Sequence, residues 1–369
     1  MNITPFALER YFARYEFSVR YLLSSSDCDG LRQSEVLSFA DAETAELWDS
    51  LTLSYTESLG LPLLRQEIAR LYSGVGPDKV LVAAPEEGIF LAMHALLRAG
   101  DHVICTWPGY QSLYEVATDI GCEVSRWEPD EAAGWHFDVK ALSTMVRSTT
   151  KLIVCNFPHN PTGSTLTREE FERLVDFASR HGIHLFADEM YKFLEADPAA
   201  RLSSACEQYE RGITLSGMSK SLGLPGARIG WLVTQDRALY DRVAALKDYT
   251  TICSSAPSEI LSVIALRAKE RILARHTARV RRNVEAFQSF LAAHEGLFRC
   301  VMPRGGTMCF PRYLAPEGAS AFAKRVRSGA GIMLLPSKVY GYGDSHLRVG
   351  LGRENVPQIL ELLHTYLTA

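Results

Sequence analysis

Short apolar runs alternate with helix-like segments along the middle of the chain, from about Val80 to Val233. The apolar runs are residues 80–84, 102–106, 151–155, 183–187, 213–216 and 229–233. Segments with the spacing of amphipathic helices, such as residues 89–97 and 171–180, lie between them. This alternation predicts an α/β fold, with a mostly parallel sheet and helices on both of its faces. Ligands bind at the carboxyl ends of the strands in such sheets, so the site is expected there.

The length of the chain favours two packed units over one. A chain of 369 residues is longer than one ordinary core, and after about Ser254 the alternating pattern gives way to charged helical sequence and a shorter strand-and-helix set. We predict a large domain at residues 41–259. Residues 1–40 and 260–369 are predicted to form a smaller α+β domain together.

Charge and composition favour small-molecule partners. The 39 basic and 43 acidic residues give a formal net charge of -4 and are scattered without long blocks, which argues against a nucleic-acid surface. No window approaches the run of about eighteen apolar residues that a membrane span needs, and residues 1–5 lack the features of a secretory leader. The eight cysteines are far apart and include no CxxC pair. We therefore expect a cytoplasmic protein with reduced thiols, no metal site, no nucleic-acid partner and no membrane contact.

Lys220 lies in a stretch of small residues, 217–230, with Arg228 eight positions after it. Because its neighbours Ser219 and Ser221 are small, a flat ring can approach the lysine closely. Burial lowers the pKa of a lysine, and the neutral amine condenses with a carbonyl to form a Schiff base. Arg228 would hold a phosphate as a two-pronged donor. A lone lysine is more often a solvated loop residue, but these neighbours favour an aldehyde cofactor that carries a phosphate.

Two segments at predicted strand ends are suited to a phosphate and a flat ring. Glu86 and Glu87 begin the helix after the first strand, where free backbone N–H groups form a phosphate site, and we expect their side chains to point away. Tyr110 follows the next strand and is expected to stack on a heterocycle, because Trp107 lies nearer the strand. The alternative for Glu86 and Glu87 is an ordinary helix start, and the alternative for Tyr110 is a buried aromatic residue without a ligand.

Four further polar residues complete the predicted site. Asn160 lies in the proline-containing turn 156–163, which would aim its side-chain amide at a fixed point such as a ring phenolate oxygen. Asp188 ends a strand buried on both faces, where a carboxylate needs a cation such as a protonated pyridine nitrogen. Tyr191, three residues on, reaches the same phenolate oxygen. Arg348 sits in an apolar strand and matches an α-carboxylate, although a structural ion pair explains it equally well.

Together these residues resemble the fold-type-I pyridoxal-phosphate enzymes of the class I/II aminotransferase family. The resemblance runs from about Tyr55 to Arg348, and the Lys220 segment carries the signature. It implies a seven-stranded-type sheet and pyridoxal 5'-phosphate as the cofactor. It implies that Lys220 forms the internal aldimine and then moves the proton between the substrate's Cα and C4′ of the cofactor. Asp188, on the pyridinium, and Tyr191, on the phenolate oxygen, are the other implied catalytic residues.

The resemblance also implies which residues hold the cofactor and the substrate. The cofactor-binding set is Tyr55, Glu86, Glu87, Tyr110, Asn160, Asp188, Tyr191, Ser219, Lys220 and Arg228. Arg348 and Asn160 are the implied substrate-binding residues, and Arg348 would take the α-carboxylate. In the family, the tyrosine matching Tyr55 reaches the cofactor phosphate of the neighbouring subunit, which implies a homodimer with shared active sites.

Two positions depart from the family pattern. Gly217 stands where family members commonly have Ser or Thr, three residues before the lysine, and Ser216 is a candidate replacement for the missing hydroxyl. Ala84-Pro85 replaces the glycine and small hydroxyl residue of the first phosphate turn. We therefore expect backbone amides to do more of the phosphate binding.

The resemblance implies an aminotransferase that moves an α-amino group from an L-amino acid to a 2-oxo acid. The same residues serve a lyase, or a cyclase like the capreomycidine-forming relatives in the family. A ligand-binding protein on this scaffold is disfavoured because Lys220, Asp188, Asn160 and Arg348 are all present.

The N-terminal region is expected to bear on substrate choice. Residues 10–17 carry aromatic and charged side chains that either close over the site or form an amphipathic helix packed on the core. Residues 24–29 form a polar loop expected near the pocket, in which no residue is assigned a role.

Overall fold

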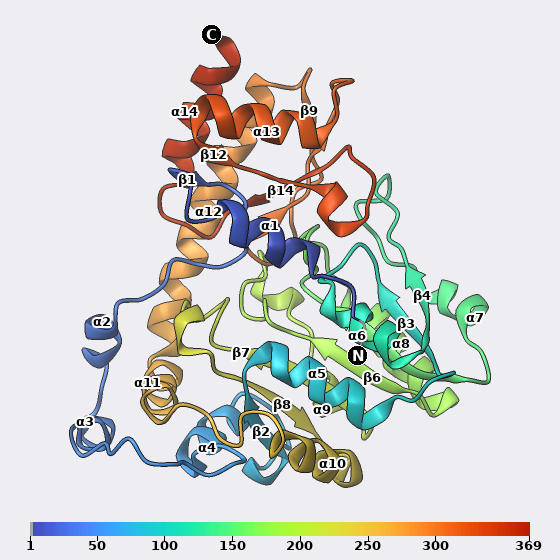
Figure 1. Ribbon diagram of the computed structural model, residues 1–369, viewed down its shortest axis with the longest axis vertical. Coiled ribbons are helices and arrows are strands. Elements are labelled where there is room, and N and C mark those ends of the chain that lie inside the picture. The colour runs from blue at the N-terminus through green and yellow to red at the C-terminus, as the bar shows by residue number, and fades with distance from the viewer. Residues whose placement is uncertain (1–2) are drawn as a thin grey trace.

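The computed structural model describes residues 3–369 and has a central sheet of seven strands (Figure 1). In spatial order the strands are β2 (Val80–Ala83), β8 (Gly230–Thr234), β7 (Gly212–Gly217), β6 (His184–Asp188), β5 (Thr150–Asn156), β3 (His102–Thr106) and β4 (Glu123–Trp127). β8 is antiparallel to both of its neighbours, and the other pairings are parallel. The predicted mostly parallel sheet is confirmed.

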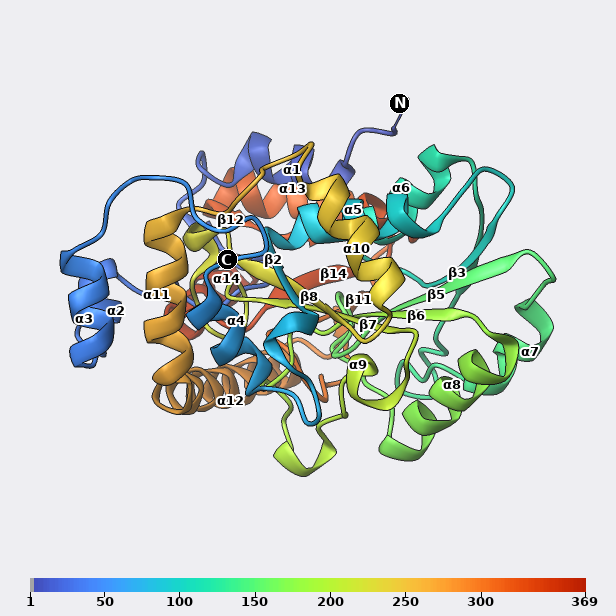
Figure 2. The same ribbon diagram turned by 90° about the horizontal axis from the view of Figure 1, so that it is seen from below.

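Helices cover both faces of this sheet because successive side chains of a strand point to opposite sides. Leu81 and Val103 pack with the helices α5 (Pro85–Leu96), α6 (Ser112–Ile120) and α10 (Arg237–Lys247). Val82 and Ile104 face the other way, toward α4 (Pro62–Ala69), α8 (Arg168–His181) and α11 (Ala256–Arg267). Figure 2 shows α5, α6 and α10 on one side of the sheet and α8 on the other.

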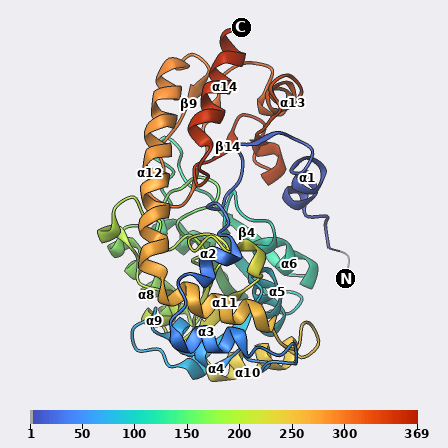
Figure 3. The same ribbon diagram turned by 90° about the vertical axis from the view of Figure 1, so that its left-hand side faces the viewer.

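Smaller sheets are built from the two ends of the chain. β1 (Tyr21–Leu22) pairs in parallel with β12 (Ile332–Met333), so the N-terminal segment joins the C-terminal part. β10 (Met308–Cys309), β14 (Leu347–Gly350) and β13 (Leu335–Pro336) form a second sheet, and β11 (Arg312–Tyr313) with β9 (Phe298–Arg299) a third. The long helix α12 (Lys269–Ala293) runs from the central-sheet part to these sheets (Figure 3). The division into two domains at the bounds given above stays a prediction.

The remaining helices lie around these sheets. They are α1 (Ala7–Tyr15), α2 (Gln33–Leu37), α3 (Ala42–Asp49), α7 (Leu142–Met145), α9 (Ala205–Gln208), α13 (Ala319–Ala330) and α14 (Val356–Thr368), with 3-10 turns at Pro77–Lys79, Val139–Ala141, Pro198–Ala200, Pro225–Ala227 and Ser337–Tyr340. Across residues 3–369, no helix is both long and apolar enough to cross a membrane. All eight cysteines are free thiols.

The parallel strands bring three chain segments to one edge of the central sheet. Asn156, at the end of β5, pairs with Asp188, at the end of β6, and Asp188 pairs with Leu215 near the end of β7. The loops that follow these strands therefore start side by side. They are the loops in which most of the predicted site residues lie.

Candidate active site

A cavity of about 570 Å³ lies beside this edge of the central sheet. The predicted residues that line it are Glu86, Tyr110, Asn160, Asp188, Tyr191, Ser219, Lys220, Arg228 and Arg348. Glu87 and Tyr55 do not line it, and Tyr55 is 87% exposed in the loop before α4. Among residues 3–369, no group of His, Cys, Asp and Glu side chains is arranged to hold a metal ion.

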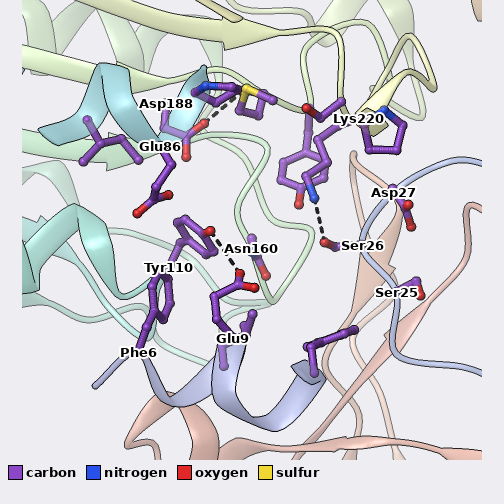
Figure 4. Close-up of a pocket in the computed structure, with 18 of the residues that line it drawn as sticks. Phe6, Glu9, Ser25, Ser26, Asp27, Glu86, Tyr110, Asn160, Asp188 and Lys220 are labelled. Atoms are coloured by element: carbon purple, nitrogen blue, oxygen red, sulfur yellow. Dashed lines mark hydrogen bonds between the residues drawn. The ribbon is translucent and has the colours of Figure 1, made fainter. Parts of the chain in front are cut away.

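Lys220 follows β7 and extends into the cavity (Figure 4). Its Nζ donates a hydrogen bond to Ser26 Oγ at 3.1 Å. Burial lowers the pKa of this amine, and the nearby Arg348 acts in the same direction, while Asp27 and Glu9 oppose them. The amine is therefore neutral more often than that of an ordinary lysine, which makes it a better nucleophile and base.

Asp188 ends β6 and is 5% exposed. Its carboxylate accepts a hydrogen bond from the Met190 N–H at 3.1 Å. Burial nevertheless raises its pKa to about 7. Within residues 3–369, no Lys, Arg or His nitrogen lies within 4.0 Å of this carboxylate. A buried carboxylate of this kind is suited to a cationic ligand.

Arg348, on β14, is 2% exposed and has no carboxylate within 4.0 Å in the described chain. Its Nε and Nη2 both donate to the Ser24 carbonyl oxygen, at 3.0 and 2.7 Å, and its Nη1 donates to the Tyr340 hydroxyl at 2.8 Å. The alternative of a structural ion pair is therefore not what the structure contains. A buried guanidinium without an anion is suited to the carboxylate of a ligand.

Asn160 and Tyr191 lie beside Arg348 at the cavity. The Asn160 Oδ1 accepts hydrogen bonds from the Tyr340 hydroxyl at 3.1 Å and from Arg348 Nη1 at 3.3 Å. These bonds occupy the amide oxygen, so Nδ2 is the group left to donate to a ligand. Tyr191 is buried, and burial raises the pKa of its hydroxyl. Sequence reasoning did not find Tyr340, which belongs to no motif and reaches the site only through the packing of the C-terminal part.

Ser219 and Arg228 lie on either side of the 3-10 turn Pro225–Ala227, at the cavity. The Ser219 hydroxyl is buried and has no hydrogen-bond partner. Arg228 is exposed at the rim, with Nη1 donating to the Pro225 carbonyl oxygen at 3.0 Å. An unpaired hydroxyl and an accessible guanidinium are donors suited to a phosphate.

A side chain at Gly217, where the family pattern places a hydroxyl residue, would be crowded by its neighbours. A Cβ added to Gly217 would lie 3.0 Å from Gly230 Cα and 3.2 Å from Pro85 Cγ. Ser216 does not line the cavity, so it does not take over the phosphate role considered for it. The two departures from the family pattern, Ala84-Pro85 and Gly217, are therefore linked, because Pro85 lies next to the space that a side chain at position 217 would need.

The expectation that the Glu86 side chain points away from the site is wrong. Glu86 and Ile89 both line the cavity, because residues three apart share one face of α5. Burial raises the pKa of the Glu86 carboxyl. Glu87 does point away: its carboxylate accepts hydrogen bonds from the Ala84 N–H at 3.4 Å and from the Thr251 hydroxyl at 2.8 Å.

Tyr110 is the aromatic residue at the cavity, as predicted, whereas Trp107 does not line it. The rings of Tyr110 and Phe6 lie with centroids 4.9 Å apart, and the Tyr110 hydroxyl donates to Glu9 Oε1 at 3.2 Å (Figure 4). Tyr110 is therefore held in place by the segment that contains α1.

The helix α1 forms one wall of the cavity. Of the two alternatives given for this region, a segment that closes over the site and a helix packed on the core, sequence reasoning favoured the second. Glu9, Phe12 and Glu16 line the cavity, while Leu8 is buried, so the helix both packs on the protein and covers the site. The spacing of residues 9, 12 and 16 along one helix face is the signal that could have found them. Ser26 and Asp27, from the polar loop 24–29, also line the cavity.

Comparisons with known proteins agree on the family. The family model described as "Aminotransferase class I and II" matches residues 21–363. Capreomycidine synthase of Streptomyces vinaceus is 29% identical over 93% of this chain and 88% of that protein. A PLP-dependent aminotransferase of Streptococcus suis superposes with a TM-score of 0.93, at 28% identity, over 100% of this chain and 98% of the other. The PLP-dependent cyclase OrfR superposes with a TM-score of 0.89, at 25% identity, over 100% and 97%.

Proposed function

This chain belongs to the class I and II aminotransferase family, and from that premise we propose that it is a transaminase, which moves the α-amino group of an L-amino acid to a 2-oxo acid. It is an enzyme of the PLP-dependent aminotransferase fold, and its cofactor is pyridoxal phosphate. When bound, this cofactor withdraws electrons from the α-carbon of an amino acid and can carry its amino group. The observation that carries the proposal is a cavity lined by a lysine whose pKa burial lowers, a buried carboxylate that forms no ion pair and a buried arginine that forms no ion pair within residues 3–369.

The unpaired groups of the cavity fit the parts of this cofactor. The buried hydroxyl of Ser219 lacks a partner and would donate to the phosphate together with Arg228 and the backbone amide of Glu86. The backbone amide of Glu87 was predicted to donate as well, but Glu87 does not line the cavity. Asp188 lacks a cation and would pair with the ring nitrogen. Three further residues complete the fit: Asn160 and Tyr191 would donate to the phenolate oxygen, and Tyr110 would stack on the ring.

Lys220 and Arg348 would act on the substrate. Arg348 orients the amino acid by binding its α-carboxylate with the guanidinium fork. Lys220 Nζ would then lie near the α-carbon, and because burial lowers its pKa it would take the proton from the α-carbon and deliver it to C4′ of the cofactor. Ser26, at 3.1 Å from Nζ, holds the amine in position when it is not bonded to the cofactor.

A cyclase or lyase acting on an amino acid is the second candidate. Two comparisons favour it, since capreomycidine synthase and the cyclase OrfR both match this chain over nearly its full length. The residues named above serve either outcome, because both begin with removal of the α-proton.

An experiment with the cofactor-loaded protein separates the two candidates. A pool of L-amino acids is added without any 2-oxo acid, and the absorbance of the bound cofactor is followed while products are identified by mass spectrometry. Transamination converts the cofactor once to its amine form and releases one equivalent of a 2-oxo acid. Release of ammonia or of a cyclised product with the cofactor unchanged would overturn transamination and support the second candidate.

We also propose a homodimer in which Tyr55 of one subunit reaches the cofactor phosphate of the other. Support comes from exposed apolar side chains on neighbouring loops: Leu53 and Tyr55 lie in one, and Tyr249 and Ile252 in another that the Thr56 hydroxyl joins through the Ser254 carbonyl oxygen at 3.4 Å. Sedimentation of the holoenzyme tests the assembly. A cytoplasmic location stays a prediction.

A further inference from the structure

The wall of the cavity formed by α1 carries carboxylates that the proposed reaction does not use. Glu9, Phe12 and Glu16 lie on one face of this helix, and we refer to them as the α1 wall. Figure 4 shows Glu9 extending from α1 into the cavity beside Tyr110. Glu86 faces the same space from α5 and adds a third carboxyl group.

In the described part of the chain, the carboxylates of Glu9 and Glu16 form no ion pair. Across residues 3–369, no Lys, Arg or His nitrogen lies within 4.0 Å of the carboxylate of Glu9 or Glu16. Glu9 is bonded only by a neutral hydroxyl, that of Tyr110, at 3.2 Å. Burial raises the pKa of Glu16, which is the response of a carboxyl group without a full charge partner.

The basic residues of the cavity are already engaged, so a second carboxylate on the substrate has no partner. The Arg353 Nη2 donates to both carboxylate oxygens of Asp27, each at 3.1 Å. Arg348 is assigned to the α-carboxylate, and Arg228 and Lys220 to the cofactor. An acidic side chain would therefore meet Glu9 and Glu16 with no free cation.

Two further features describe the space in front of the α1 wall. Ser25 lines the cavity and is 4% exposed, and its hydroxyl has no hydrogen-bond partner, so it can bind a polar group of a ligand. Phe6, Leu8 and Phe12 supply apolar surface to the same cavity. A side chain with an apolar stem and a charged end matches this combination.

We propose that the α1 wall binds the cationic end of the substrate's side chain, and that the substrate is an amino acid with a guanidinium or ammonium group. The inference rests on the proposed function, since it places an amino acid at Lys220. We expect Glu9 to be the stronger of the two partners, because a neutral hydroxyl bonds its carboxylate at 3.2 Å, whereas the charge of Arg353 partly offsets that of Glu16.

The test compares amino acids that differ in charge but little in shape. L-arginine is paired with L-citrulline, and L-lysine with L-norleucine. Each is titrated into the cofactor-loaded enzyme, and the concentration that gives half of the absorbance change of the bound cofactor is measured. We expect arginine or lysine to saturate at a concentration about 10-fold or more below that of its neutral partner, because a charge-assisted hydrogen bond is lost with the charge.

Isosteric variants then assign the preference to the α1 wall. Glu9→Gln keeps an oxygen to accept from Tyr110 and is expected to remove the preference for the cationic member of each pair. Glu16→Gln is expected to reduce it a few-fold. Glu172→Gln, on the exposed face of α8, is the matched control and should leave it unchanged. Thermal melting of each variant confirms that it is folded.

The outcomes separate this inference from the proposed function. If neutral or acidic amino acids react and the cationic ones have no advantage, or if Glu9→Gln keeps the preference, the α1 wall does not select the substrate while the function stands. If no amino acid changes the bound cofactor at all, the proposed function fails, and the inference fails with it.

Discussion

The two walls of the cavity are built in different ways. One consists of strand ends and the loops that follow them, and it carries Asn160, Asp188 and Lys220. The other is α1, which reaches the site from the N-terminus and carries Glu9 and Glu16. The sheet wall holds groups suited to the chemistry that all members of the family share, whereas the α1 wall holds groups suited to choosing one substrate.

The walls also differ in how firmly they are held. The sheet wall is anchored by hydrogen-bonded strands buried on both faces. The α1 wall is held by side chains and not by a strand ladder. Gln111 accepts from the Ala7 N–H at 2.8 Å and donates to the Pro5 carbonyl oxygen at 3.2 Å, the Tyr11 hydroxyl donates to the Leu334 carbonyl oxygen at 2.9 Å, and Leu8 is buried. We therefore expect changes in the sheet wall to abolish turnover and changes near the α1 wall to alter substrate binding.

Lys220→Ala should have the largest effect. Turnover should fall by about 10³-fold or more, because the variant lacks the amine that bonds the cofactor and moves the proton. Steady-state turnover and the visible absorbance of the bound cofactor are the measurements. Lys324→Ala, exposed on α13, is the control. Retained turnover with bound cofactor would show that Lys220 is not the residue that bonds the cofactor and moves the proton.

Asp188→Asn should lower turnover on the order of 10³-fold while the protein stays folded. The amide has the size of the carboxylate but does not hold a cationic ring nitrogen. Single-turnover kinetics with the loaded variant measure the effect, and circular dichroism checks the fold. A rate close to that of the wild type would contradict the pairing of Asp188 with the ring.

Asp188 should also make the cofactor-free protein less stable as the pH rises. Its pKa is raised to about 7 in the folded protein, above the ordinary value near 4, so folding favours the protonated form. The resulting loss of stability grows between about pH 4 and pH 7 and then levels, and it amounts to a few kcal/mol. Urea unfolding of wild type and Asp188→Asn at pH 5 and pH 8 measures it. The stability advantage of the variant should be larger at pH 8, and an equal difference at both values would refute the shift.

Arg348→Gln should raise the half-saturating concentration of the amino acid by about 10- to 100-fold, because a bidentate charged contact to the α-carboxylate is lost. Titration of the bound cofactor's absorbance is the measurement, with Arg180→Gln on α8 as the control. Since Arg348 also binds the Ser24 carbonyl oxygen, thermal melting must accompany it. If the half-saturating concentration is unchanged in a folded variant, Arg348 does not bind the α-carboxylate of the substrate.

Gln111→Ala should have the smallest effect on activity, and it tests whether the α1 wall acts on substrate binding and not on turnover. The variant lacks the two hydrogen bonds that Gln111 makes to Pro5 and Ala7, at the start of α1, so the half-saturating concentration of the substrate should rise a few-fold with kcat nearly unchanged. Gln208→Ala, exposed on α9, is the control. A fall in kcat without a change in saturation would show that α1 acts on the chemistry and not on binding.

Sequence reasoning found the strands and the sheet wall because both depend on local patterns. Apolar runs predicted β2, β3 and β5–β8 nearly residue by residue, and a lysine, an aspartate and an asparagine at strand ends are recognisable by position alone. It failed for Glu86, whose direction depends on the rotation of α5, and it did not find Tyr340 or Glu9. Spacing along a helix shows which residues share a face, as for residues 9, 12 and 16, but only the packing of that helix shows that the face meets a cavity.

The chain's own sequence therefore establishes the sheet, the family and the residues at the strand ends, because period-two burial and a compact motif are properties of neighbouring residues. The packing of distant segments establishes the rest. Pro85 against Gly217, Tyr340 against Asn160, and α1 over the cavity bring together residues far apart in the chain. The first contact depends on packing within the central-sheet part, and the other two depend on how the two ends of the chain pack against it. Long-range packing, which no window of sequence records, decides which side chains line the cavity beside the residues at the strand ends.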